Sequence, residues 1–169
     1  MKKLMLASLA LLALSSAPAA LARPITATDL ATMRRLASPS VSPDGRWVVY
    51  QLSETDLEAN RRRQDLFLLD LRAADAEPAM IASTPDHNEH DPRFSADGRW
   101  IYYLSNASGS EQLWRVAPAG GEGERLTDFH TDVAGYLPSP AGDRVAIWAD
   151  RDMACADINC ANVPAAAEG

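Results

Sequence analysis

The sequence lacks the short motifs that carry chemistry in most hydrolases. It contains no Gly-x-Ser-x-Gly turn, which holds the nucleophile of α/β-hydrolases, and no His-Gly-Gly-Gly run for an oxyanion hole. Its three histidines, His87, His90 and His130, stand in no recognisable triad context. The sequence therefore offers no catalytic residue, no cofactor-binding residue and no metal-ligand set, and we expect no cofactor.

Basic residues are outnumbered. The chain has 16 Lys and Arg against 23 Asp and Glu, which gives a net charge of −7. Nucleic-acid binding depends on clustered Lys and Arg that neutralise phosphates. The one basic cluster, residues 61–63, is explained by an exposed loop. The charge balance argues against nucleic acid as the main partner.

Only one long apolar run is present, and it lies near the N-terminus. Two lysines precede it, residues 4–14 are apolar except for one serine, and Ala20 and Ala22 frame a small-x-small cleavage site. This order is typical of a secretory signal peptide over residues 1–22, and the run is too short to span a bilayer. An uncleaved anchor is the alternative. We expect an exported bacterial protein, periplasmic or secreted, with no membrane span after cleavage.

Cysteine is nearly absent, with only Cys155 and Cys160 present. An even count in an exported protein suggests a disulfide. Only four residues separate the two cysteines, so a disulfide would close a short loop. Because a short loop constrains the unfolded chain little, the bond would add only modest stability. Free thiols and metal ligation are the alternatives, although two cysteines are too few for a closed zinc site and the nearest histidine is far away in sequence.

A nine-residue motif occurs three times and sets the fold prediction. It is SPDGRWVVY at residues 42–50, SADGRWIYY at residues 95–103 and, more loosely, SPAGDRVAI at residues 139–147. The copies start 53 and then 44 residues apart. This spacing is typical of four-stranded propeller blades, which need about 40–50 residues each.

Each copy of the motif predicts a tight turn followed by a strand. Proline presets φ at the first turn position, aspartate bonds its own backbone, and glycine takes the left-handed position. In the third copy Ala141 replaces the aspartate, which weakens that turn. The residues assigned to the turns are Ser42, Pro43, Asp44, Gly45, Ser95, Asp97, Gly98, Ser139 and Gly142.

The strands after the first two turns are apolar at every position. Residues 47–50 and 100–103 show no alternation, so both of their faces should be covered, as between stacked blades. Core packing also explains the four tryptophans better than a stacking surface for a ligand does. The carboxylates of the turns are explained by turn geometry rather than by catalysis.

Further strand-like segments complete two repeats. Residues 65–71 correspond to residues 112–116, and a short fourth strand follows each. Blade one is then predicted at about residues 38–84 and blade two at about residues 91–128, with blade three starting near Tyr136. The predicted fold class is all-β: a partial β-propeller of two four-stranded blades plus an incomplete third, preceded by a signal peptide and a short helix.

The predicted domains follow from these elements. Residues 23–37 form an N-terminal helical segment, residues 38–160 the incomplete propeller, and residues 161–169 an Ala-rich tail. The helix is placed at residues 28–36 with a threonine cap, and its apolar face is expected to pack on blade one. Propellers close with about four to eight blades, so the chain is expected to be part of something longer.

The segment DHNEHD at residues 86–91 concentrates two histidines and three carboxylates. We interpret it as a polar, solvated connection between the first two blades, at one rim of the ring. The alternatives are a surface that faces a neighbouring domain or a substrate, and a metal site, since all these side chains are common ligands.

The repeated Ser-Pro-Asp-Gly-Arg-Trp motif with its apolar strand resembles the blade signature of TolB-like propellers and of the propeller that opens prolyl-oligopeptidase-family serine peptidases. Two further features are similar to secreted bacterial dipeptidyl-peptidases and acylaminoacyl-peptidases. These are residues 25–30 leading into residues 38–45, and the cysteine loop at residues 155–160.

The resemblance implies a role without chemistry of its own. In that family the propeller precedes an α/β-hydrolase domain with a Ser-Asp-His triad, caps the active site and admits only short peptides. None of the family's catalytic positions falls on this sequence. The implied partners are short peptide substrates and a C-terminal hydrolase domain outside this chain.

The leading hypothesis is therefore the substrate-gating cap of an exported serine peptidase, inactive by itself. The alternative is a TolB-like periplasmic propeller that binds protein partners without catalysis. A third possibility is a small binding protein complete in itself. An unclosed stack of blades argues against it, because apolar faces and strand edges would stay open.

Overall fold

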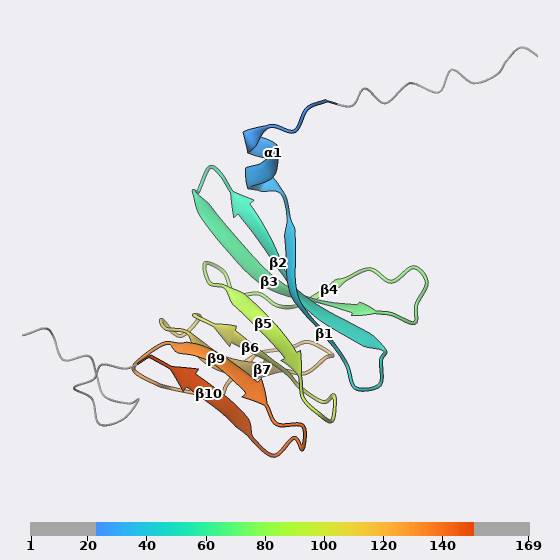
Figure 1. The fold of residues 1–169 in the computed structure, drawn as a ribbon, viewed down its shortest axis with the longest axis vertical. Helices are drawn as coiled ribbons and strands as arrows, with labels where there is room; N and C mark the ends of the chain where they lie inside the picture. Colours follow the sequence, from blue (N-terminus) through green and yellow to red (C-terminus); the bar gives the residue numbers. More distant parts are fainter. Residues whose placement is uncertain (1–22, 151–169) are drawn as a thin grey trace, which may run out of the picture.

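The computed structural model describes residues 23–150 of the chain. Within this range the chain forms one short helix and ten strands, all in antiparallel sheets (Figure 1). No helix in residues 23–150 combines the length and apolar character needed to cross a bilayer. The predicted signal peptide, with Ala20 and Ala22 at its cleavage site, the loop with Cys155 and Cys160, and the Ala-rich tail lie outside the described residues.

Two four-stranded sheets and one two-stranded sheet follow one another along the chain. Blade one consists of β1 (Arg35–Val41), β2 (Trp47–Asp56), β3 (Arg61–Asp70) and β4 (Ala79–Ala82). Blade two consists of β5 (Glu89–Phe94), β6 (Ile101–Ser105), β7 (Gln112–Val116) and β8 (Glu124–Arg125). The start of blade three consists of β9 (Val133–Pro138) and β10 (Val145–Ala149). The predicted fold class, two four-stranded blades and an incomplete third, is confirmed.

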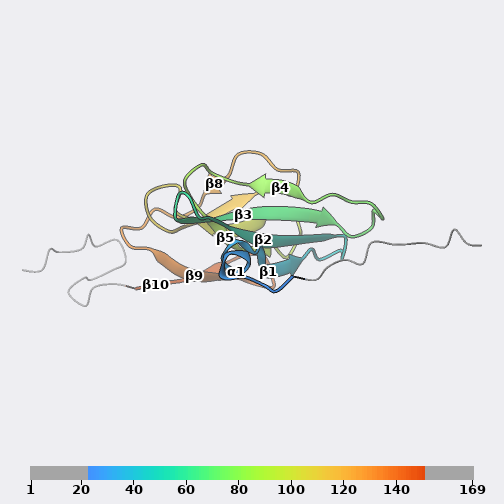
Figure 2. The same cartoon turned by 90° about the horizontal axis from the view of Figure 1, so that it is seen from above.

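The sheets are stacked face to face. Figure 1 shows blade one, blade two and the β9–β10 hairpin in succession, and Figure 2 shows β4 and β8 along one edge of the molecule with β1 and β9 along the other. The first strand of blade one lies beside the first strand of blade two. This is the radial arrangement that a propeller repeats around its axis.

Apolar side chains fill the two junctions between blades. The first core joins blades one and two, and its buried members are Val49, Leu66, Leu68, Ile81, Phe94, Ile101, Tyr103 and Val116. The second joins blades two and three, and its buried members are Leu104, Leu113, Val133 and Tyr136. Blade two is therefore covered on both faces, whereas blade one is covered on the face toward blade two.

This difference corrects one prediction. Buried and partly exposed positions alternate along β2, and in residues 47–50 only Val49 is fully buried. Along β6, four of the five residues are buried. The sequence pattern predicted cover on both faces of both strands. Of these two strands only β6 receives it within residues 23–150, because β6 belongs to the sheet between the other two.

The turn that starts each hairpin has one geometry in blades one and two. In blade one, the Ser42 hydroxyl donates to Asp44 at 2.6 Å and accepts from the Trp47 amide at 2.9 Å. In blade two, Ser95 contacts Asp97 and Trp100 in the same way, at 2.6 and 3.0 Å.

Glycine closes each of these turns. Gly45 and Gly98 have φ of +67° and +69°, the left-handed conformation that only glycine adopts without cost. Gly142 takes the same conformation in blade three, with φ of +75°. In all three turns the glycine amide donates to the carbonyl of the serine that begins the motif. Pro43 and Pro140 follow that serine in the first and third turns.

The third turn keeps its shape by a substitution of partners. Ala141 stands where the other two copies have aspartate, so the Ser139 hydroxyl donates instead to Asp143 at 2.9 Å. The Gly142 amide still donates to the Ser139 carbonyl at 2.9 Å. The neighbouring aspartate thus supplies the acceptor that the motif lacks.

The helical segment is shorter than predicted. α1 spans Ala27–Thr32, and Thr26 caps it in a capping box with Asp29. Leu36 does not continue the helix but lies in β1, where it pairs with Leu52. The expected packing of an apolar helix face on blade one is wrong for these residues, since α1 buries none of its residues.

Candidate functional site

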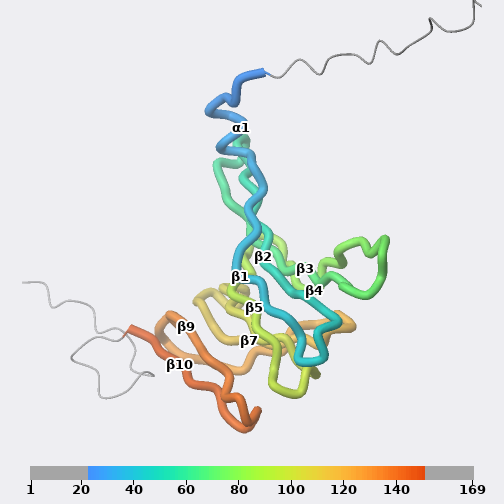
Figure 3. Tube along the Cα trace, turned by 45° about the vertical axis from the view of Figure 1, so that its right-hand side comes forward, coloured from blue at the N-terminus to red at the C-terminus, as the bar shows by residue number. Residues whose placement is uncertain are grey.

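One rim of the described stack carries many polar side chains. Because neighbouring strands are antiparallel, the links between blades and the turns between second and third strands lie on the same side. We call this side the polar rim, and it comprises residues 57–60, 83–90, 106–111 and 126–132. All three histidines of the sequence lie in it. Figure 3 shows the long β2–β3 hairpin and α1 extending beyond it.

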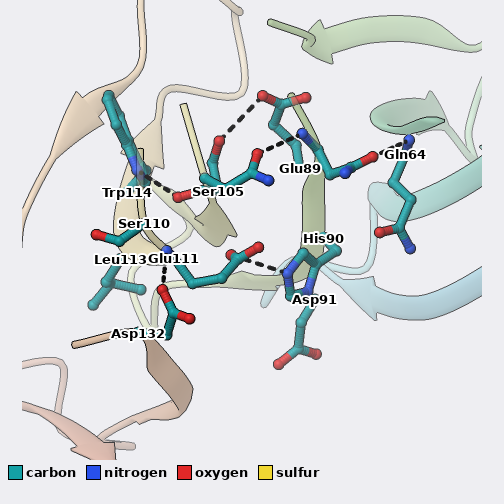
Figure 4. Close-up of polar contacts among 12 residues, drawn as sticks. Gln64, Glu89, His90, Asp91, Ser105, Ser110, Glu111, Leu113, Trp114 and Asp132 are labelled. Atoms are coloured by element: carbon teal, nitrogen blue, oxygen red, sulfur yellow. Dashed lines mark hydrogen bonds and ion pairs between the residues drawn. The ribbon is translucent and has the colours of Figure 1, made fainter. Parts of the chain in front are cut away.

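Glu89 is the most unusual residue of the polar rim. It opens β5 and is 1% exposed. Its Oε1 accepts from the Ser105 hydroxyl at 3.2 Å, and its Oε2 has no hydrogen-bond partner within the described residues (Figure 4). Burial raises the pKa of the Glu89 carboxyl. The rim thus contains a carboxylic acid placed where its charged form is disfavoured.

This position corrects the interpretation of residues 86–91 as a solvated connection. The last three of these residues begin β5 rather than a loop, and the first two of the three pair with the end of β6. A second carboxylate, Asp65 on β3, is also buried nearby, and it forms an ion pair with Arg63 at 2.9 Å. Glu89 therefore lies inside the junction of blades one and two, whereas Asp86 at the start of the segment is exposed.

His90 and Glu111 form a contact on the other face of β5. The His90 Nε2 and the Glu111 Oε2 lie 3.2 Å apart (Figure 4). The Glu111 amide donates to Asp132 at 2.8 Å in the link to blade three. The imidazole therefore contacts a carboxylate of its own blade, and the backbone of Glu111 makes the bond toward blade three. Within residues 23–150, no group of three or more His, Cys, Asp and Glu is arranged to hold a metal ion.

The links between blades are fixed by repeated side-chain caps. Asn88 accepts from the Gln64 amide at 3.0 Å, at the start of the third strand of blade one. Asp132 accepts from the Glu111 amide in the equivalent place one blade later. The Asn88 amide in turn donates to Asn106 at 2.9 Å. These bonds fix the backbone of the links between blades, and they thereby fix the positions of the side chains that the polar rim exposes.

A bulge in β5 adds a second cross-link. Asp91 has φ of +50°, and its amide donates to Gln51 on blade one at 3.4 Å. Its carbonyl accepts from the Tyr136 hydroxyl on blade three at 2.6 Å. Burial raises the pKa of Tyr136, which therefore stays a donor. Ser38 has a similar φ of +47° at the same repeat position of β1.

A cavity of about 410 Å³ opens at the junction of blades one and two. Its walls are residues 80–84 after and within β4 and the segment at residues 121–123. Tyr103 lines it, and burial raises the pKa of this tyrosine to about 12. Gly123 leaves the space that the Tyr103 ring occupies, because a Cβ there would overlap its hydroxyl.

The residues singled out from the sequence lie at opposite rims: residues 86–90 belong to the polar rim, and the turn residues lie on the other side. The turn residues that begin with Ser42, Ser95 and Ser139 lie at the rim opposite the polar rim, where they shape hairpins. Sequence reasoning missed Glu89 as a buried group. A signal was available: it lies six residues before a turn serine, as Leu36 and Val133 do, and both of those residues are apolar.

Three curated relatives of the chain are named as peptidases. It is 30% identical over 119 residues to dipeptidyl-peptidase 5 of Porphyromonas gingivalis, a match that covers 70% of this chain and 17% of that protein. It is 27% identical over 124 residues to the uncharacterized peptidase YuxL of Bacillus subtilis, covering 73% of this chain and 18% of that protein. The chain thus spans less than a fifth of the length of these relatives. No family model matches it.

Solved propellers have the same arrangement. A TolB structure from Agrobacterium tumefaciens is 28% identical with a TM-score of 0.56, over 73% of this chain and 41% of that one. A puromycin hydrolase is 21% identical with a TM-score of 0.54, over 67% of this chain and 18% of that one. The latter likeness shows the fold. Over its blades the chain is similar to the N-terminal region of bacterial dipeptidyl-peptidases, as its repeated turn motif predicts.

Proposed function

We propose that these blades are the substrate-gating propeller of an exported serine peptidase that cleaves short peptides. The observation that carries the proposal is the match to two dipeptidyl-peptidase 5 proteins, 29% and 30% identical, over most of this chain. The described blades lack a nucleophilic elbow, so the hydrolytic step belongs to a hydrolase domain elsewhere in the protein.

The polar rim suits the face that meets such a domain. It carries histidines, carboxylates and amides whose backbone is fixed by the caps at Asn88 and Asp132. It is also the rim where the chain enters blade one from α1. At the opposite rim, the serines and aspartates of the turns in blades one and two bond within their own turns.

Export is part of the proposal and is supported by the first 22 residues. Their order of lysines, apolar run and small-x-small site is that of a secretory signal. Amino-terminal sequencing of the protein recovered from the periplasm or the medium tests it. A mature chain that starts at Arg23 supports export, and an intact Met1 in the cytoplasm contradicts it.

The catalytic part is tested on the complete reading frame. The protein is expressed whole and assayed with dipeptidyl and N-acylated aminoacyl arylamides, with and without a serine-directed reagent. We expect hydrolysis that the reagent abolishes, and none from residues 23–169 alone. A folded whole protein that cleaves neither substrate class contradicts the proposal.

A TolB-like binding propeller is the second candidate, favoured by the likeness to the Agrobacterium tumefaciens TolB structure at 28% identity. The two candidates differ in what the gene encodes after residue 169. Further blades followed by a Gly-x-Ser-x-Gly elbow favour the peptidase. Further blades and a stop codon favour the binding protein.

A further inference from the structure

Glu89 is buried between blades one and two with part of its hydrogen-bonding capacity unused. The side chain is 1% exposed, and its Oε2 has no partner within the described residues. An ionised carboxylate removed from water is stable only with donors or a cation beside it. The closed junction therefore accommodates the neutral acid better than the carboxylate.

The groups around Glu89 compensate its charge only in part: Arg63 is the cation near it, and hydrogen bonds from Thr84 and Ser105 favour the carboxylate, but burial outweighs them and raises the pKa. From β3, Asp65 adds a second negative charge, and Arg63 is engaged in the ion pair with Asp65. From β6, Tyr103 and Ser105 contribute hydroxyl groups, as does Thr84 from the link after β4. On its own strand, the neighbouring His90 is paired with Glu111.

The repeats show that the fold does not need a carboxylate at this position. Val133 occupies it in blade three, is 2% exposed, and forms part of the core between blades two and three. Leu36 occupies it in blade one. An apolar side chain thus fills this place between blades two and three, whereas Leu36 is 60% exposed. Glu89 brings to this junction a property that valine lacks, which is a charge that depends on pH.

We propose that Glu89 is a proton-operated latch on the junction of blades one and two, which holds the blades closed when neutral and loosens them when ionised. The cavity beside β4 shares Thr84 and Tyr103 with the surroundings of Glu89, so loosening the junction opens that cavity further. This inference concerns the blades themselves and holds whether or not the protein is a peptidase.

The direction of the pH effect follows from the burial of the side chain. Burial raises the pKa of Glu89 in the closed form. The closed form then holds a proton that the open form releases, so closure is favoured at low pH. This advantage is lost as pH rises from the ordinary glutamate value, about 4.3, through the raised value.

Two backbone amides report the state of the junction. The Asp91 amide donates to Gln51 at 3.4 Å and the Phe94 amide to Ser40 at 3.2 Å, both from blade two to blade one. Residue-resolved amide exchange is measured from pH 4 to 8 on the full-length protein and corrected for intrinsic rates. In the wild type we expect protection of both amides to fall with pH, about tenfold for each unit by which the pKa is raised.

The variant Glu89→Gln keeps the shape of the side chain and removes its titration. We expect protection at Asp91 and Phe94 to become independent of pH in this variant. The Glu111 amide, which bonds to Asp132 toward blade three, is the internal reference and should not respond. Glu58→Gln, at the exposed tip of the β2–β3 hairpin, is the matched control and should behave as the wild type.

Two results overturn the proposal. One is an unchanged pH dependence at both amides in Glu89→Gln. The other is a Glu89 side-chain carbon signal, in the NMR spectrum of the wild type, that titrates at or below the ordinary glutamate value. The second measurement needs no variant, so it decides the matter even if Glu89→Gln does not fold. Glu89→Val, which copies Val133, is a further non-titrating variant.

Discussion

The Tyr136 hydroxyl donates to the Asp91 carbonyl at 2.6 Å and thereby joins the first strand of blade three to the bulge in the first strand of blade two. The same hydroxyl lies 2.9 Å from the Tyr102 carbonyl. Because Tyr136 is fully buried, no water replaces these contacts. One phenol group thus satisfies the backbone at the point where the strand departs from regular pairing.

Tyr136→Phe should therefore destabilise the stack. The substitution removes the donor that the Asp91 carbonyl uses inside the stack, at a cost of about 1–3 kcal/mol. Urea unfolding followed by tryptophan fluorescence measures the loss. The matched control is Tyr50→Phe on β2, where the ring stacks on Phe67 in a partly exposed position and little change is expected. Equal losses in the two variants would contradict the role assigned to the buried hydroxyl.

The turn glycines give a second, graded prediction. Gly45→Ala and Gly98→Ala both force alanine into the left-handed region, at a cost of about 1–2 kcal/mol. A Cβ at Gly98 also approaches Pro43 of the preceding blade at 3.3 Å, whereas a Cβ at Gly45 meets no atom within 4 Å. We expect Gly98→Ala to lower the free energy of unfolding more. The opposite order would show that the turns do not contact across blades.

The third turn predicts a coupling between two positions. Asp143→Ala removes the acceptor of the Ser139 hydroxyl and should cost about 0.5 kcal/mol, since the contact is exposed. Ala141→Asp restores the acceptor found in the other turns and should stabilise, more so when Asp143 is absent. A double-mutant cycle on unfolding free energies measures the coupling. Additive effects would mean that the two carboxylates do not share the serine.

The repeat motif made the blades predictable because it fixes backbone geometry locally. Serine, aspartate and glycine bond within six residues, so the turns follow from sequence alone. The end of α1 did not follow. Leu30, Met33 and Leu36 have helical spacing, yet the chain leaves the helix after Thr32 because Leu36 pairs with Leu52 in the sheet.

Glu89 shows what local pattern cannot provide. The segment around it is entirely polar, which predicts exposure, and its burial arises only when blade one is stacked on blade two. The repeat alignment with Val133 carries the missing information, because this position is buried in both blades that stack on a preceding sheet. Positions compared across copies of a repeat therefore predict burial better than the polarity of their neighbours in sequence.

The turn aspartates predict a loss of stability in acid. Hydrogen bonds from the Ser42 and Ser95 hydroxyls hold the pKa of Asp44 and of Asp97 below the usual range. A lowered pKa stabilises the fold above the ordinary aspartate value, and this contribution is lost as pH falls through the lowered value. Asp97→Asn should therefore flatten the fall in urea midpoint between about pH 4 and pH 2. Asp75→Asn, in the exposed link after β3, is the control, and an equal flattening there would show that general charge, rather than the turn bond, sets the acid sensitivity.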